Sequence, residues 1–143
     1  MELEGKIWKS KKFWLIEVPS LDVMTQGKSR EDALDMIRDA IIELVKCYFE
    51  SIVRKQFDIT LNNYQRGVIG IRASDNKLLL ALSLRRQREK SGSTVRQAAE
   101  RLGAKSPNAY AQYERGKIRI SLDQYEKLLK AANPLQHSLL RMV

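Results

Sequence analysis

The chain has 143 residues, of which 43% are hydrophobic and 30% charged, and its formal net charge is +9. Its longest fully apolar stretch, residues 78–82, is too short to cross a bilayer, and its first residues lack the basic-then-apolar pattern of a secretion signal. These features predict a globular cytoplasmic protein without a membrane segment. Since the sequence has one Cys and one His, an internal disulfide is impossible and a structural zinc site is not expected.

The first half of the chain predicts a small sheet packed against one long helix. Ser29 can cap a helix in which apolar residues recur every three or four positions from Ala33 to Ile52. Cys47 lies within this helix and is expected to be inert packing. A turn is expected at Asn62-Asn63. Short aromatic and β-branched runs predict five strands, at residues 3–8, 13–18, 23–26, 57–61 and 68–72.

The second half predicts a series of helices. Thr94 and Gln97 have the spacing of a capping box, Gly103 ends that helix, and Ser106 followed by Pro107 can start the next. Two short helices joined by a tight turn indicate either a helix-turn-helix or an ordinary helical hairpin. Helices are predicted at residues 77–90, 94–103, 106–116 and 121–133, with a short last one from residue 135.

Charge separates the two halves. Residues 1–76 hold 12 Lys and Arg against 12 Asp and Glu, whereas residues 77–143 hold 14 against 5, so the whole excess lies in the second half. A localised basic surface is expected of a nucleic-acid module, and a membrane-binding surface fits less well because this half has no Trp or Phe. Helix pattern and charge together favour a DNA-binding helix-turn-helix. We therefore predict an α+β protein with a sheet domain at residues 1–74 and an all-α domain at residues 75–143.

The second half resembles the Xre/Cro-type helix-turn-helix family over about residues 77–132. The resemblance lies in Arg-Glu-Lys-Ser-Gly-Ser-Thr at 88–94, Ala-Ala-Glu-Arg-Leu-Gly at 98–103 and Tyr-Glu-Arg-Gly at 113–116. It implies an ion pair between Arg88 and Glu114. Many members carry Gln at two recognition positions that are Val95 and Pro107 in this chain, so base readout is expected to depend on other residues.

The residues predicted to contact DNA lie on and around the second helix of the motif. Asn108 and Gln112 are four residues apart and share one helix face, and amide side chains can bond adenine in both directions. The residues expected at phosphates are Lys105, Ser106, Arg115, Lys117 and Arg119. The predicted DNA-binding set is Lys105, Ser106, Asn108, Ala109, Gln112, Arg115, Lys117 and Arg119.

The neutral half resembles the HicB-type antitoxins of type II toxin–antitoxin systems. The resemblance lies in Phe-Trp-Leu-Ile-Glu-Val-Pro at 13–19 and in Thr-Gln-Gly-Lys-Ser-Arg-Glu-Asp-Ala-Leu at 25–34. It implies a reduced RNase H-like fold that blocks a small HicA-type mRNA-cleaving toxin, while the second half represses the operon by binding operator DNA as a homodimer or higher oligomer. No toxin-contact residue is predicted. The alternative is a helix-turn-helix repressor whose first domain senses a small ligand.

An RNase H-like domain raises the question of nuclease activity, which would require carboxylates clustered around two metal ions. The candidates are Glu17, Asp22, Asp32, Asp35 and Asp58. Helix capping and turn formation account for acids at such positions, and no nucleophile–base pair or Gly-rich phosphate loop can be recognised. The lone His137 is expected on the surface or in a tail. The sequence therefore predicts a binding protein rather than an enzyme, with neither metal nor cofactor.

Overall fold

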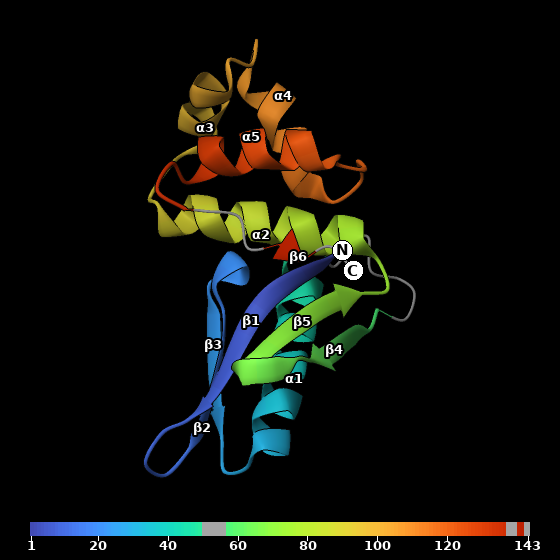
Figure 1. Cartoon of the computed structure of the whole chain (residues 1–143). Coiled ribbons are helices and arrows are strands. Elements are labelled where there is room, and N and C mark those ends of the chain that lie inside the picture. The colour runs from blue at the N-terminus through green and yellow to red at the C-terminus, as the bar shows by residue number, and fades with distance from the viewer. Residues whose placement is uncertain (50–56, 137–139, 142–143) are drawn as a thin grey trace. The chain divides into compact units, whose positions relative to one another are not determined.

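The computed structural model in Figure 1 describes residues 1–49, 57–136 and 140–141. The chain forms two compact units: Met1–Asp75 together with Leu139–Val143, and Asn76–Ser138. The predicted α+β class is confirmed, since the first unit holds a sheet and a long helix, and the described residues of the second form helices and turns. The predicted boundary after residue 74 lies beside this division, but the last residues return to the first unit.

The first unit is built on an antiparallel sheet with the strand order β3-β2-β1-β5-β4 (Figure 1). Apolar residues alternate along the strands and meet across the ladders; Ile7, for example, lies opposite Ile16. A short 3-10 helix, η1 (Pro19–Leu21), joins the second strand to the third. The five strands are β1 (Glu2–Lys9), β2 (Trp14–Val18), β3 (Val23–Gly27), β4 (Ile59–Asn63) and β5 (Val68–Ala73).

The hairpin between β4 and β5 differs from the prediction. The strand β4 begins and ends two residues later than expected, so the turn predicted at Asn62-Asn63 is wrong. Asn63 pairs with Ile69, and the chain reverses through η2 (Gln65–Gly67), where Gly67 has a φ of 72°. Pairing with β5 overrides the local preference of Asn for turns, and glycine adopts the left-handed backbone without steric cost.

One long helix, α1 (Arg30–Tyr48), covers one face of the sheet (Figure 1). It begins as predicted, because the Ser29 Oγ accepts a hydrogen bond of 3.0 Å from the Asp32 amide. Cys47 is exposed, so its predicted packing in the core is wrong; two residues beyond the buried Val45, it lies about 200° around the helix. Residues 50–56, and with them the predicted extension of the helix, lie outside the described residues. The buried stripe of the helix consists of Ala33, Ile37, Ile41 and Val45.

A buried carboxylate on β1 reaches across β5 to β4. Glu2 on β1 is fully buried, and its two carboxylate oxygens accept hydrogen bonds from the Asn62 amide and, at 2.7 Å, from the Tyr64 hydroxyl. Gly70 on β5 leaves room for this group, since a Cβ there would lie 2.6 Å from the Glu2 Cδ. Burial opposes ionisation of Glu2, but the hydrogen bonds from Tyr64 and Asn62 and the charge of Arg72 outweigh it and lower its pKa below the ordinary 4.5.

The lowered pKa makes the stability of the first unit depend on pH. A carboxyl whose pKa is lower in the folded state stabilises that state above the ordinary pKa, and this contribution is lost as pH falls through the folded value. We expect the difference in unfolding free energy between wild type and Glu2→Gln to be constant above pH 4.5 and to shrink below it. Urea unfolding followed by Trp fluorescence tests this, since both Trp residues lie in the first unit. A difference that stays constant down to the acid transition would contradict it.

The second unit contains the predicted helices over residues 76–132, with the third one divided. Its core includes Tyr125, Leu128 and Leu129 of the last helix, which packs against the first two. The elements are α2 (Asn76–Lys90), α3 (Val95–Leu102), α4 (Pro107–Ala111), the 3-10 helix η3 (Gln112–Arg115) and α5 (Leu122–Ala132).

Beyond α5, the predicted helix from residue 135 is wrong for the described residues. Pro134 and Leu135 form a turn, and β6 (Leu140–Arg141) pairs with β1 instead. β2 pairs only with the Lys6–Lys9 part of β1, which leaves the edge at Leu3 open for this extra strand. The ladder hydrogen bonds with β1 therefore determine the conformation of Leu140–Arg141, which local helix propensity did not predict. His137 lies outside the described residues.

Buried polar pairs fix α5 against α2. The Tyr125 hydroxyl lies 2.8 Å from the Ser83 Oγ, and the Asn133 amide donates to the Gln87 side-chain oxygen at 2.9 Å. Burial raises the pKa of Tyr125 to about 12, although the hydrogen bond to Ser83 acts in the opposite direction. The phenol therefore stays neutral at physiological pH, and these satisfied polar groups set the register between the two helices.

Candidate DNA-binding interface

A tight turn joins α3 to the α4–η3 segment. The Thr94 Oγ1 accepts from the Gln97 amide at 3.1 Å, and the Gln97 Oε1 accepts from the Thr94 amide at 2.9 Å, which completes the predicted capping box. α3 ends at Gly103, whose φ of 75° is left-handed, and the Ala104 amide donates to the Ala99 carbonyl at 3.0 Å. These bonds satisfy the free carbonyls at the end of α3 and redirect the chain within two residues.

The second helix of the motif is shorter than predicted as an α-helix. The Ser106 Oγ accepts from the Ala109 amide at 3.3 Å, and Pro107 occupies the first turn, as expected from the sequence. The α-helical hydrogen bonding stops at Ala111, and the chain continues as η3 up to Gly116, where φ is 75°. Tyr110 is fully buried and anchors this segment to the core.

Arg88 and Glu114 form the ion pair that the family resemblance implies. The Arg88 Nε and Nη2 donate to the two Glu114 carboxylate oxygens at 2.8 and 3.0 Å, while its Nη1 donates to the Ser93 carbonyl at 3.1 Å. The side chains are only 14% and 7% exposed. Hydrogen bonding to Glu114 raises the pKa of Arg88, so the guanidinium stays positively charged. It ties α2 to η3 directly behind the exposed segment.

Sequence reasoning did not find a second Arg contact in this unit. The Arg101 Nη1 donates to the Ser93 Oγ and to the Ala131 carbonyl, both at 2.8 Å, and so connects the end of α3 to the end of α5. A basic residue in the last turn of a helix is normally explained by the dipole of its own helix. No signal in the local sequence points to a carbonyl 30 residues away.

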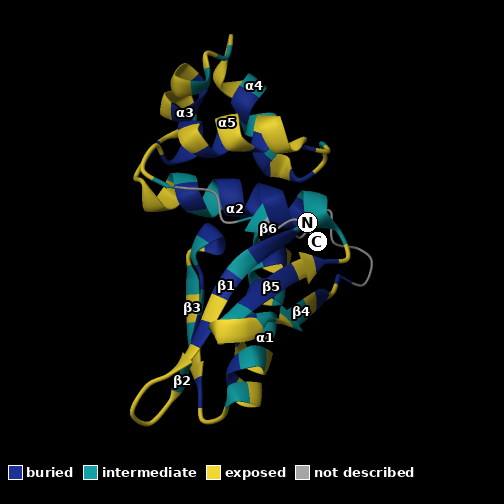
Figure 2. Ribbon diagram, in the orientation of Figure 1, coloured by how far each residue is buried: buried dark blue, intermediate teal, exposed yellow. Residues whose placement is uncertain are grey.

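Six of the eight predicted DNA-contact residues of this unit are exposed, and two are half-buried. Figure 2 shows the turn before α4 as exposed, in agreement with the burial of its residues. Ala109 and Gln112 are half-buried, and the Gln112 Nε2 donates to the Ala109 carbonyl at 3.1 Å. Their contact with DNA stays a prediction. The exposed members of the set are Lys105, Ser106, Asn108, Arg115, Lys117 and Arg119.

Two of these side chains meet in a way that the sequence does not indicate. The Arg115 Nη2 donates to the Asn108 Oδ1 at 2.8 Å, across seven residues of the chain. The sequence-based prediction assigns Asn108 to a base edge and Arg115 to a phosphate, as separate contacts. The structure brings them together into one polar group at the surface.

The electrostatics of residues 103–120 favour an anionic partner. The segment holds four basic residues, and its one acid, Glu114, is occupied by Arg88. Within the described part of the chain, Lys105, Lys117 and Arg119 form no ion pair with an acidic side chain. Positive charge without internal neutralisation, on an exposed helix and the loop that follows it, is suited to phosphates.

The candidate catalytic carboxylates all lie in the first unit. Three of the candidate carboxylates have local partners: Asp32 accepts from the Lys28 amide at 3.0 Å, Asp58 from the Ile59 amide at 2.8 Å, and Asp35 lies 3.4 Å from Arg38. Over residues 1–49, 57–136 and 140–141, no three His, Cys, Asp or Glu side chains are placed to hold a metal ion. The lack of enzymatic activity stays a prediction.

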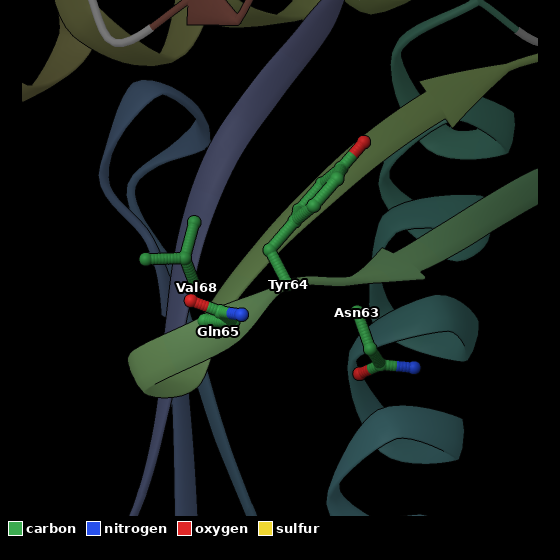
Figure 3. Close-up of a pocket in the computed structure, with 4 residues that line it drawn as sticks. All are labelled: Asn63, Tyr64, Gln65 and Val68. Carbon is green, nitrogen blue, oxygen red and sulfur yellow. The ribbon is translucent and has the colours of Figure 1, made fainter.

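A shallow pocket opens where β4 turns into β5. It is lined by two amides, a phenol ring and one aliphatic side chain, and the Tyr64 hydroxyl is already bound to Glu2. Figure 3 shows the ring of Tyr64 lying along β5, away from the Gln65 and Asn63 side chains. Among the residues that the structure describes, no carboxylate, His or Cys lines it. The lining residues are Asn63, Tyr64, Gln65 and Val68.

Comparison with known proteins identifies the second unit. None of the curated proteins matches the chain. No helix in the described ranges is long and apolar enough to span a membrane. Residues 84–137, which run from the middle of α2 past the end of α5, match the family model described as helix-turn-helix. This part of the chain is therefore a helix-turn-helix domain, the type of domain that binds DNA in transcription regulation.

Proposed function

We propose that this protein represses its own operon by binding promoter DNA through residues 105–119, and that its first unit neutralises a small HicA-type toxin encoded beside it. The observation that carries the DNA part is the family match, together with three exposed cations, Lys105, Lys117 and Arg119, that have no acidic partner in the described structure. In a helix-turn-helix, the second helix lies in the major groove and the flanking residues contact the backbone. We expect a homodimer that reads an inverted repeat with half-sites about one helical turn apart.

Lys117 provides a test of the phosphate contacts. Its side chain is exposed in the loop after η3, so Lys117→Gln should weaken binding to operator and random DNA by the same factor. Each lost phosphate contact should also reduce the slope of log affinity against log salt by about 1. Lys127→Gln, an exposed lysine on α5 outside the predicted set, is the control and should leave both quantities unchanged. A loss confined to the operator would show that Lys117 reads bases instead.

The antitoxin part of the proposal is supported by the first unit. The two segments that resemble HicB-type antitoxins form β2 with the turn after it, and the end of β3 with the start of α1. Exposed apolar side chains at Trp8, Phe13 and Met24 offer a surface for a partner protein. A relation to the RNase H-like fold belongs to this proposal as well.

Co-expression tests the antitoxin proposal. A neighbouring reading frame for a small basic protein with a catalytic His is cloned alone and together with this chain. We expect the toxin alone to stop growth, and the chain both to restore growth and to co-purify with it. If the chain neither restores growth nor co-purifies but still binds its promoter, the protein is a repressor without an antitoxin role, and a ligand-sensing first unit becomes the better explanation.

A further inference from the structure

The contact between Asn108 and Arg115 fixes which atoms each side chain can offer to DNA. A guanidinium group has only N–H donors, so the Asn108 atom that faces Arg115 must be the carbonyl oxygen Oδ1. The Asn108 Nδ2 is therefore turned away from Arg115. Apart from the second lone pair of Oδ1, which lies beside the guanidinium, the groups of this pair left for DNA are the two Nδ2 hydrogens and the remaining guanidinium hydrogens, all of which are donors.

Gln112 has the opposite arrangement. Its Nε2 donates to the Ala109 carbonyl, so one amide hydrogen is used within the helix and the oxygen Oε1 is left to accept a bond. The two amides, which look equivalent in the sequence, thus differ in the structure. Asn108 belongs to a donor pair, whereas Gln112 presents a free acceptor oxygen beside its one remaining amide hydrogen.

The major-groove edges of the bases distinguish between these groups. Guanine presents two neighbouring acceptors, N7 and O6, and adenine presents one acceptor and one donor, N7 and N6. A bidentate contact with adenine requires the Asn oxygen to accept from N6, but in this protein a positively charged guanidinium lies against that oxygen at 2.8 Å. The N6 hydrogens would be repelled by that charge, whereas the guanine acceptors would be attracted to it.

We infer that Asn108 and Arg115 act as one reading unit that selects guanine, while the Gln112 oxygen selects a base with an exocyclic amino group, adenine or cytosine. This inference rests on the proposed DNA-binding function and replaces the sequence-based assignment of Asn108 to adenine and of Arg115 to a phosphate. Both side chains of the pair are exposed, so neither is required for the core. The pair is held by a hydrogen bond within the free protein and is oriented before DNA arrives.

The test begins with selection of preferred duplexes from a randomised library by the full chain. Affinities are then measured for wild type, Asn108→Ala, Arg115→Ala, the double variant and Gln112→Ala. We expect both single variants of the pair to lose the preference for the same guanine by about 5–150-fold, which corresponds to 1–3 kcal/mol for a bidentate contact. The double variant should lose no more than either single one, and Gln112→Ala should affect a different position.

Two atomic substitutions sharpen this test. Replacing the selected guanine with 7-deazaguanine removes the N7 acceptor, and it should weaken wild type but not Asn108→Ala or Arg115→Ala. Asn108→Asp keeps an acceptor for Arg115 but removes the Nδ2 donors, and it should lose the guanine preference although the pair remains. Selection of adenine at the position sensitive to Asn108, or independent losses from Asn108 and Arg115, would overturn this inference alone. Equal binding to all duplexes would overturn the proposed function as well.

Discussion

Arg88→Ala is expected to destabilise the helix-turn-helix unit by roughly 3–5 kcal/mol, the largest effect predicted for a single substitution in this chain. The cost arises because the Glu114 side chain, which is only 7% exposed, would stay buried and lose both of its donors from Arg88. The buried Tyr110 nearby supplies no positive charge in place of the guanidinium. Burial and the Glu114 charge raise the pKa of its phenol, so the phenol stays neutral. The measurement is urea unfolding followed by far-UV circular dichroism.

A double variant separates the effect of charge from the effect of packing in this experiment. Arg88→Met combined with Glu114→Leu removes both charges and should recover most of the lost stability, since well-packed apolar residues often replace a buried ion pair at little cost. For all of these variants, the urea midpoint followed by Trp fluorescence, which reports on the first unit, should shift less than the midpoint followed by circular dichroism. An Arg88→Ala variant within 1 kcal/mol of wild type would show that the pair does not hold η3 against α2.

Gly27→Ala is expected to have the second largest effect, at the upper end of the roughly 1–3 kcal/mol that overpacking costs. Gly27 ends β3 where the first turn of α1 crosses it, and an added Cβ would clash with the Ala33 amide and lie 2.8 Å from the Ala33 Cα. These are backbone atoms, so no side-chain rotation relieves the contact. The glycine of the Thr-Gln-Gly segment is thus explained by packing of a strand against a helix.

Trp fluorescence measures this second effect, because Trp14 lies opposite Gly27 in the β2–β3 ladder. Gln26→Ala, an exposed neighbour on the same strand, is the control and should change the unfolding free energy by less than about 0.5 kcal/mol. The displacement of α1 should lower the urea midpoint of Gly27→Ala without changing its DNA affinity. Equal midpoints for the two variants would show that α1 can move away from β3 without cost.

Features with a short-range cause could be predicted from the sequence. The capping box of Thr94 and Gln97, the left-handed Gly103 and the Ser106 cap each involve residues within about one helical turn, so the pattern alone defines them. The charge division between the halves is a property of the sequence itself. These signals are sufficient to predict the helix-turn-helix.

Features that depend on distant partners could not be predicted in this way. The extension of β4 through Asn63 is decided by pairing with β5, and β6 exists because β1 has an open edge at Leu3. The same holds in the candidate site: the hydrogen bond from Arg115 to Asn108 sets the orientation of an amide whose residue type alone allows either direction. Sequence located the residues, and only the structure shows which atoms they present.

The most direct test of the central claim is a competition measurement with the chain's own promoter. A labelled promoter duplex and a random duplex of the same length compete for the full chain at physiological salt. The helix-turn-helix domain with its exposed cations at residues 105–119 predicts that the promoter is bound about a thousandfold or more tightly than random DNA. Equal affinity for the two duplexes would contradict the claim that this protein is a sequence-specific repressor of its own operon.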